Sequence, residues 1–333
     1  MTKKIYIYPT YTPNRGGDAG NFYIKHFHDS FEKNPNFKLI NRKWQIGISS
    51  LFFNLDANIF VIQWVDLIIH KRFGKIQFLF FLIGMFTLRV LNKKIIWVLH
   101  NKHAHRGESK LVDFAMKLMA KYSTVVITHS NEGVAFFNEK YGKKYGEKAH
   151  HIPHPVYSST IVKPEEIQWD FIIWGGVNTR SRVAEFLSFV KNNPFFAGKK
   201  IVICGSCTDT DYKNKVLHNV TPNVTFISKF LPDEELAHYI ARSGCVVFTY
   251  NPASVLSSGA MIHSLNFNKP MIAPRAGNFK DMKGVVYCYD SFDDIPLFDY
   301  PLTVDSNVIG EYMKENTWDR FSGTIFTLIS NVV

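Results

Sequence analysis

Apolar residues in this chain gather in short runs that are separated by segments of helical length. In the first half these runs are rich in β-branched and aromatic residues, and they lie at 4–9, 46–52, 59–64, 94–100, 123–128 and 150–155. A second series lies at 170–176, 199–205, 223–228, 245–250, 270–274 and 284–289. Strand-length runs that alternate with helix-length segments predict βαβ units on parallel sheets. The pattern therefore predicts an α/β protein with two Rossmann-like sheets.

A stretch without clean periodicity separates the two series. Residues 155–169 carry proline, serine and charge, and they follow "HIPHP", where two prolines stop a helix. We predict an N-terminal Rossmann-like domain over 1–155, a C-terminal one over 170–305 that faces it across a cleft, and a helical segment over 306–333. This last segment is expected to return toward the N-terminal domain.

Composition and charge narrow the class of protein. The 333 residues are 46% hydrophobic, which excludes a disordered chain, and the net charge of +11 favours an anionic partner such as a nucleotide, a phospholipid surface or an acidic polymer. The N-terminus lacks the apolar core of a secretory signal, so we expect a cytoplasmic protein. Direct nucleic-acid binding is not expected, because no basic stripe is interleaved with stacking aromatics. Cys204 and Cys207 have redox or metal spacing, but they fit a turn at the end of a strand better.

One run is too apolar for an ordinary surface helix. Residues 76–91, "IQFLFFLIGMFTLRVL", are flanked by lysine and arginine on both sides. The run is shorter than the roughly 20 residues that span a bilayer. It is either a helix buried against a sheet or a helix that lies partly in a membrane surface with its basic flanks on lipid headgroups.

Candidate ligand-binding residues follow the strand-like runs of the second half. Ser257, Ser258, Gly259 and Ala260 stand where a short helix begins after the run at 245–250, so free backbone N–H groups there suit a phosphate. An ordinary helix cap without a ligand explains the same residues. After the run at 170–176, Gly176 permits close approach of a diphosphate, and the nearby guanidinium groups of Arg180 and Arg182 are fork-shaped donors.

The first half offers candidates for acid–base chemistry. Gly16 and Gly17 form a glycine-rich loop after the first strand, and Asp18 on that loop is a candidate base for an acceptor hydroxyl, although a solvated loop aspartate explains it as well.

His100 and His129 end strand-like runs and are candidate contacts to a sugar or nucleotide, with Ser130 and Asn131 as caps of the following helix. His103 and His105 make a metal conceivable near His100. No matching further ligands follow them in the sequence, so we expect no metal site.

These features together resemble the GT-B glycosyltransferases over nearly the whole chain. The segments that carry the resemblance are "IIWGGVNTRSR", "ISKFLPDEELAHYIARSGCVVFTY" and "SSGAMIHSLNFNKPMIAPRAGN". The resemblance implies a UDP- or GDP-linked sugar against the second half, with Gly176, Arg180 and Arg182 at the diphosphate. It also implies that the residues from Ser257 to Ala260 donate backbone N–H groups and that the loop with Ser228 and Phe230 borders the nucleobase of the donor. It implies no metal, because the helix start and basic groups neutralise the leaving diphosphate.

The chain departs from one pattern of that family. The retaining GT-4 group carries Glu-x7-Glu, and the corresponding residues here are Leu256 and Ser264. An inverting reaction needs a base from the first half, for which Asp18, His100 and His129 are the candidates.

The resemblance, the charge and the apolar run together predict a hexosyltransferase that acts on a lipid-linked bacterial surface glycan such as capsule, lipopolysaccharide or exopolysaccharide. The enzyme is expected at the inner face of the cytoplasmic membrane. A nucleotide-sugar 2-epimerase and a catalytically silent nucleotide- or acidic-polymer-binding protein of the same fold are the alternatives.

Overall fold

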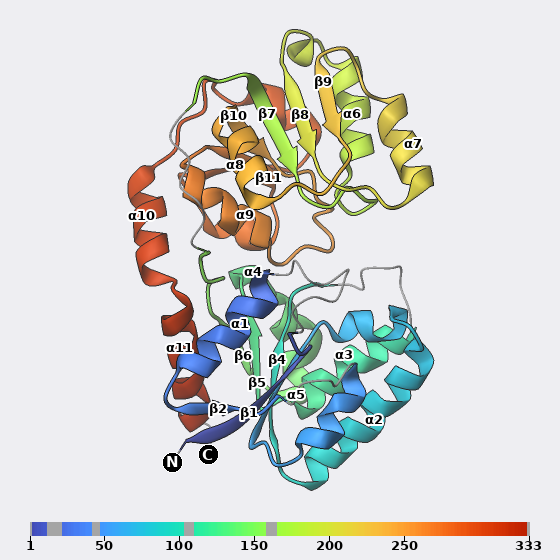
Figure 1. Cartoon of the computed structure of the whole chain (residues 1–333), viewed down its shortest axis with the longest axis vertical. Helices are drawn as coiled ribbons and strands as arrows, with labels where there is room; N and C mark the ends of the chain where they lie inside the picture. Colours follow the sequence, from blue (N-terminus) through green and yellow to red (C-terminus); the bar gives the residue numbers. More distant parts are fainter. Residues whose placement is uncertain (1, 12–21, 42–46, 103–109, 158–164, 332–333) are drawn as a thin grey trace. The chain divides into compact units, whose positions relative to one another are not determined.

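The computed structural model describes residues 2–11, 22–41, 47–102, 110–157 and 165–331. The chain divides into two compact units (Figure 1). Unit 1 comprises Met1–Pro155 and Glu315–Val333, and unit 2 comprises Val156–Lys314. The division after Pro155 falls where the proline-containing segment begins, and the last helix belongs to unit 1 rather than to unit 2.

Unit 1 is built on a parallel sheet of six strands in the order β2-β1-β3-β4-β5-β6. Its strands are β1 (Lys3–Tyr8), β2 (Phe37–Leu39), β3 (Ile59–Gln63), β4 (Lys94–Val98), β5 (Val125–Thr128) and β6 (Ala149–His151). Its helices are α1 (Phe22–Lys33), η1 (Ile48–Asn54), η2 (Val65–His70), α2 (Gly74–Val90), α3 (Lys110–Tyr122), α4 (Asn131–Phe137), η3 (Asn138–Gly142), α5 (Lys143–Tyr145) and α11 (Trp318–Asn331).

Helices cover both faces of this sheet, and its central strands β3 and β5 are buried throughout. All five residues of β3 are buried, as are the four of β5. Helices α1 and α11 lie side by side on one face, while α2 and α3 lie together with η1 and η2 on the other (Figure 1). A parallel sheet that is covered on both faces explains why its strands show continuous apolar runs instead of alternation.

Unit 2 carries a second parallel sheet of six strands, in the order β12-β11-β10-β7-β8-β9. Its strands are β7 (Trp169–Trp174), β8 (Ile201–Cys204), β9 (Val224–Ile227), β10 (Ser243–Val247), β11 (Met271–Pro274) and β12 (Val286–Tyr289). Its helices are α6 (Val183–Asn192), η4 (Pro194–Phe196), α7 (Thr210–His218), α8 (Asp233–Ala241), α9 (Gly259–Ser264), η5 (Leu265–Phe267), η6 (Gly277–Asp281), η7 (Phe292–Leu297) and α10 (Ser306–Glu315).

The core of unit 2 lies between this sheet and the helices on its two faces. Helices α6 and α7 cover one face and α8 and α9 the other (Figure 1). Phe186 of α6 is fully buried and meets the rings of Phe196 and Phe292 edge-on. Numbered in chain order, the strands of unit 2 have the 3-2-1-4-5-6 arrangement of the Rossmann fold, and those of unit 1 have the 2-1-3-4-5-6 arrangement of the other common doubly wound sheet. The prediction of an α/β protein with two Rossmann-like sheets is confirmed.

Two strand predictions need correction. The run at 46–52 was expected to be a strand, yet residues 48–54 form the 3₁₀ helix η1, in which Ile48 and Leu51 are buried three positions apart. The Ser50 hydroxyl in this helix donates a hydrogen bond to the carbonyl of Gly47 at 2.7 Å. It is also hydrogen-bonded to the hydroxyl of Tyr6. The run at 150–155 is a strand only to His151, because the prolines beyond it cannot continue the ladder.

Candidate functional site

The second sheet has one place where its winding reverses. Strands β7 and β10 are neighbours, but the chain leaves β7 toward β8 and leaves β10 toward β11 on the opposite side. Ligands of open α/β sheets bind beyond the carboxyl ends of the strands at such a switch point. The predicted residues Gly176, Arg180 and Arg182 follow β7, and the stretch from Ser257 to Ala260 follows β10. Two stretches that lie about 80 residues apart in the sequence therefore meet at one edge of the sheet.

The loop after β7 has a fixed backbone. Gly175 has a φ of 112°, which favours glycine, and a Cβ on Gly205 would lie 1.8 Å from the carbonyl oxygen of Gly175. The side-chain oxygen of Asn178 accepts hydrogen bonds from the backbone N–H groups of Arg180 (3.0 Å) and Ser181 (3.4 Å). Close packing of two glycines and an asparagine turn thus hold the loop on which Gly176 and Arg180 are exposed.

Hydrogen bonds join this loop to the segment after β10. The backbone N–H of Asn251 donates to the carbonyl of Arg180 at 3.0 Å, and the hydroxyl of Thr249 donates to the carbonyl of Ser181. Tyr250 lies between them in sequence, and burial raises the pKa of its phenol. A hydrogen bond with the Ser258 side chain and the positive charge of Arg180 act on this pKa in the opposite direction. Tyr250 therefore lies near both the arginine loop and the start of α9, a position that the sequence did not reveal.

The start of α9 keeps part of its hydrogen-bonding capacity. Ser258 is buried, its hydroxyl accepts the N–H of Met261 at 3.1 Å, and its own N–H donates to the Asn278 side chain at 3.0 Å. Ser258 is therefore a helix cap, and its amide is not available to a ligand. Within the described part of the chain, the amides of Gly259 and Ala260 donate to no protein acceptor, and both residues are half-exposed.

Arg182 lies apart from Arg180. It adopts a left-handed backbone conformation with a φ of 51°, and its guanidinium carbon lies 4.8 Å from the centre of the Phe292 ring. Its charge also lowers the pKa of Tyr289, which burial raises. Arg182 thus reaches toward the end of β12 and is partly engaged there, so the two arginines do not form a simple pair at α9.

Ser228 and Phe230 follow β9, the edge strand of this sheet. Phe230 is 71% exposed, and the hydroxyl of Ser228 is buried without a hydrogen-bond partner in the described structure. Lys229 between them pairs with Glu235 at 2.9 Å. Because β8 lies between β9 and the switch point, these two residues can border a ligand but do not adjoin the helix start.

The two positions of the Glu-x7-Glu motif hold neutral side chains that serve the fold. Leu256 is fully buried, and its carbonyl accepts the N–H of Asn278 at 3.0 Å. Ser264 is also buried, donates to the carbonyl of Ala260 at 2.9 Å and accepts the indole N–H of Trp174 at 3.1 Å. No carboxylate therefore stands at either position.

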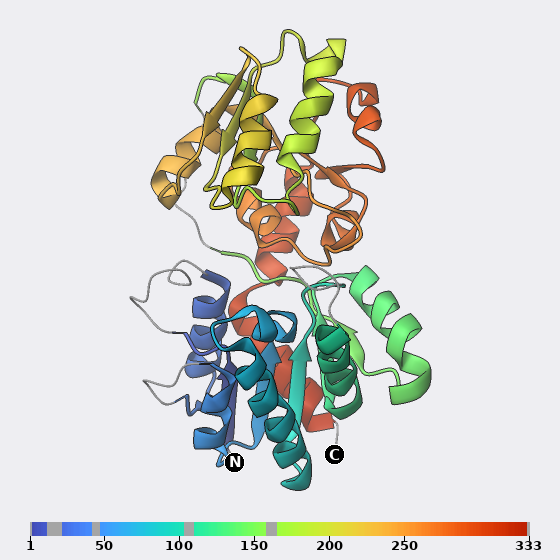
Figure 2. The ribbon, with the colours of Figure 1, turned by 90° about the vertical axis from the view of Figure 1, so that its right-hand side faces the viewer.

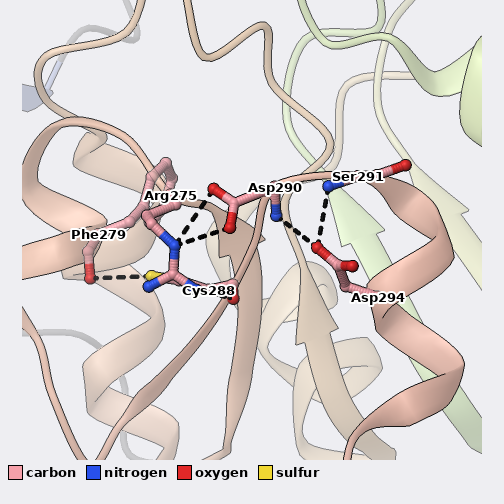
Figure 3. A network of polar contacts seen from close by, with 6 residues as sticks. All are labelled: Arg275, Phe279, Cys288, Asp290, Ser291 and Asp294. Atoms are coloured by element: carbon pink, nitrogen blue, oxygen red, sulfur yellow. Dashed lines mark hydrogen bonds and ion pairs between the residues drawn. The ribbon is translucent and has the colours of Figure 1, made fainter.

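A charged network fixes the loop that follows β11 (Figure 3). The Nε of Arg275 lies 3.0 and 3.2 Å from the two carboxylate oxygens of Asp290, and its Nη2 donates to the carbonyl of Cys288 at 3.1 Å. The carboxylate of Asp294 accepts the backbone N–H groups of Asp290 and Ser291, which lowers the pKa of Asp294. Arg275 is thus engaged by protein groups, and the network ties the ends of β11 and β12 together.

The first sheet also has a switch point, between β1 and β3. The loop after β1 contains the predicted residues Gly17 and Asp18, which lie outside the described residues. Strand β3 ends at Gln63, which is fully buried, and Trp64 follows it in a left-handed conformation with a φ of 47°. A non-glycine residue in this conformation is uncommon, and such residues gather at functional sites.

His100 is oriented by both of these residues. Its ring stacks on the indole of Trp64, with ring centres 4.3 Å apart and an interplanar angle of 5°. Its Nε2 lies 3.0 Å from the side-chain oxygen of Gln63. Because an amide oxygen only accepts hydrogen bonds, Nε2 carries the hydrogen and Nδ1 is the basic nitrogen of the neutral ring. The sequence identified His100 but not Gln63 or Trp64.

His129 has a different environment. It is buried, its Nδ1 donates to the carbonyl of Ile152 at 2.8 Å, and its Nε2 accepts the Tyr23 hydroxyl at 2.8 Å. Burial, reinforced by the neighbouring His154 and His100, holds the pKa of His129 well below its usual range. Both ring nitrogens are therefore engaged inside the protein, which removes His129 from the candidates for a base that meets an external hydroxyl. The predicted cap beside it is confirmed, since the Ser130 side chain accepts the N–H of Gly133.

Among the residues with described positions, no cluster of three histidine, cysteine or acidic side chains is arranged to hold a metal ion. His103 and His105 lie outside those residues. Cys204 ends β8 and is buried, which raises the pKa of its thiol to about 12 and makes it a poor nucleophile or metal ligand.

No protein-family profile matches the sequence, and no curated protein matches it either. Solved structures do resemble it. HepE of Anabaena, solved in complex with UDP, has a TM-score of 0.68 at 10% identity, covering 99% of this chain and 100% of that chain. The lipopolysaccharide outer core galactosyltransferase WaaB, in its apo form, has a TM-score of 0.61 at 13% identity, covering 98% and 99%. AviGT4, a glycosyltransferase involved in avilamycin A biosynthesis, has a TM-score of 0.60 at 12% identity, covering 98% and 97%. At these identities the likeness shows the fold, which is the predicted GT-B fold.

Proposed function

We propose that this protein is a glycosyltransferase that moves a hexose from a nucleotide-sugar donor to a hydroxyl group. The observation that carries the proposal is the assembly at the β7–β10 switch point. There Arg180, Tyr250 and the amides of Gly259 and Ala260 meet beyond the carboxyl ends of two neighbouring strands. Backbone N–H groups beside a guanidinium are suited to a diphosphate. The structures of HepE with UDP and with UDP-glucose support this choice of donor and favour a uridine nucleotide.

In this proposal the leaving diphosphate is stabilised by protein groups. Arg180 and the two amides lie where negative charge grows as the glycosidic bond breaks. Arg182, whose guanidinium lies over the Phe292 ring, contributes positive charge from farther away. A metal ion is not needed for this neutralisation. Because Leu256 and Ser264 replace the glutamates of the GT-4 pattern, no carboxylate at those positions can assist.

His100 is the candidate base for the acceptor hydroxyl. Gln63 orients the ring through Nε2, and the imidazole takes the proton as the hydroxyl oxygen bonds to the sugar carbon. Asp18 stays a second candidate for this role. The roles of Gly176, Ser228 and Phe230 in binding the donor remain predictions of the family resemblance. Gly17, on the glycine-rich loop after the first strand, is a further predicted donor-binding residue.

For the acceptor we propose a lipid-linked glycan of a bacterial surface polymer, presented at the inner face of the cytoplasmic membrane. The net charge of +11 and the exposed apolar helix α2 support a substrate that is anchored in an anionic membrane. In the part of the chain with described positions, no helix is long and apolar enough to cross a bilayer.

Thermal unfolding with UDP, GDP, CMP and dTDP compounds tests donor binding, because a ligand at a hundred times its Kd stabilises the native state by about 2.7 kcal/mol. We expect UDP to raise the midpoint, Arg180→Ala to abolish the shift, and Arg320→Ala on α11 to leave it unchanged. A shift that persists in Arg180→Ala would place the nucleotide elsewhere.

Radiolabelled donors then separate the alternatives. Sugar transfer or donor hydrolysis supports the transferase, and binding without either supports a silent nucleotide-binding protein. A converted donor sugar in the absence of any acceptor supports the epimerase instead.

A further inference from the structure

The outer face of α2 carries a continuous row of exposed apolar side chains. These are Ile76, Leu79, Phe80, Ile83, Phe86 and Val90, whose exposed fractions range from 39% for Phe80 to 68% for Phe86. Their spacing of three and four residues puts them on one face of the helix. The opposite face, with Phe81, Met85 and Leu88, is buried. The helix is therefore apolar on two opposite faces, while unit 1 covers only one of them, so it is not simply a helix that is buried against the sheet.

Two elements that contact α2 also carry exposed apolar side chains. Phe53 of η1 is exposed, as are Leu111 and Phe114 of α3. Both η1 and α3 lie against α2, and the two long helices run side by side in both views (Figures 1 and 2). We call the six exposed residues of α2 the α2 face. Six exposed apolar residues on one face of a single helix differ from the singly scattered exposed residues of an ordinary soluble domain.

The charges around the α2 face have one sign. Residues 67–107 contain no aspartate or glutamate but eight lysines and arginines. Arg72 and Lys75 are exposed at the start of α2, and Arg89 is exposed in its last turn. Cations therefore stand at both ends of the apolar row, where long side chains can reach phosphate groups beside an immersed helix.

This combination identifies the kind of partner. A second copy of the chain would bring the same cations to the interface, and like charges in an apolar contact oppose association. An anionic bilayer offers hydrocarbon to the apolar row and phosphates to the cations. With 17 residues, α2 is roughly 25 Å long at 1.5 Å per residue, so it matches a helix that lies along the surface.

We infer that the α2 face is a membrane-docking surface that inserts into the headgroup region of an anionic bilayer. In this arrangement α2 lies parallel to the membrane, with Leu79, Ile83 and Phe86 among the acyl chains and Arg72, Lys75 and Arg89 on lipid phosphates. The surface belongs to unit 1 alone. Its binding to lipid does not depend on a nucleotide or on sugar transfer, so it can fail or hold separately from the proposed function.

Co-sedimentation of the full chain with vesicles tests this inference. Vesicles of phosphatidylcholine with about one third phosphatidylglycerol are compared with pure phosphatidylcholine vesicles at low and high salt. We expect binding to the anionic vesicles that weakens with salt. The variant Leu79→Asp/Ile83→Asp/Phe86→Asp should lose at least tenfold in the partition coefficient. Because each basic residue near the surface contributes about a fivefold factor, Arg72→Gln/Lys75→Gln/Arg89→Gln should lose on the order of a hundredfold on anionic vesicles.

Matched controls use equal numbers of exposed apolar and basic residues in unit 2. These are Ile167→Asp/Leu217→Asp/Leu297→Asp for the apolar change and Lys191→Gln/Lys215→Gln/Lys283→Gln for the charge. Both controls should bind like the unmodified chain, and circular dichroism with thermal unfolding checks that every variant folds. Equal binding by the α2-face variants and their controls would overturn the inference. So would a chain that ignores vesicles but forms a dimer that the apolar variant abolishes, since the face would then bind a second copy.

Discussion

Acid should destabilise unit 1 because it contains histidines that are buried in the neutral form. His28, His129 and His154 are each at most 6% exposed, and burial lowers the pKa of all three. For His28 and His154 the pKa falls from 6.5 to about 4. A lowered pKa means that the unfolded chain binds more protons than the folded chain below pH 6.5. The contribution of these histidines to the free energy of unfolding is therefore fully present above pH 6.5 and is lost as the pH decreases toward 4.

The size of the effect follows from these values. At pH 5, a histidine whose pKa is 6.5 when unfolded and about 4 when folded loses about 2 kcal/mol relative to pH 8. His28 and His154 together therefore lose about 4 kcal/mol, and His129 adds to this in the same direction. Domains are commonly stable by only about 5–15 kcal/mol, so unit 1 should approach unfolding near pH 5.

Hydrogen exchange measured by mass spectrometry on peptides from β1, β3 and β4 reports the opening of unit 1 at pH 8, 7, 6 and 5, after correction for the intrinsic exchange rates. The variant His28→Gln should reduce the loss at pH 5 by about 2 kcal/mol, whereas His218→Gln, exposed on α7 of unit 2, should not change it. Equal protection of these strands at pH 8 and pH 5 would refute the reasoning. Ring carbon signals of His28, His129 or His154 that titrate near pH 6.5 in the folded protein would refute it as well.

Three further substitutions test the two candidate sites. Gly205→Ala puts a methyl group 1.8 Å from the Gly175 carbonyl oxygen, so it should destabilise unit 2 by about 1–3 kcal/mol and weaken the UDP-induced thermal shift. Gly198→Ala is the control, because its new methyl group meets no atom within 4 Å. Leu256→Glu restores one glutamate of the GT-4 pattern but buries an unpaired charge, so it should lower stability by about 3–5 kcal/mol without raising transfer activity. A gain in transfer activity would contradict this expectation. Gln63→Leu should lower kcat for transfer by about a hundredfold and alter its pH profile, because His100 loses the acceptor that fixes its tautomer. Gln63→Glu keeps an acceptor and should retain more activity. Identical pH profiles for the two variants would argue against a role for His100 as the base.

The order of the elements followed from the sequence to a large extent. Buried parallel strands need continuous apolar runs, and such runs marked β3, β4, β8 and β11 correctly. The run that became η1 was misjudged, because short apolar segments fit a strand and a 3₁₀ helix equally well until their neighbours are known. The three-residue strand β2 was missed, since it is too short to show any period.

The candidate site likewise combines features that the sequence predicts with features that only the fold decides. The sequence by itself determined that Gly176, Arg180 and the start of α9 follow strands, because glycine turns and helix caps are local features. Only the tertiary structure decided that Tyr250 lies near both Arg180 and Ser258, that Gln63 and Trp64 orient His100, and that His129 is buried. It also decided that one face of α2 is left uncovered. These properties depend on which distant strand ends meet and which surfaces pack, and the order of strands in a sheet is a long-range property that no local pattern encodes.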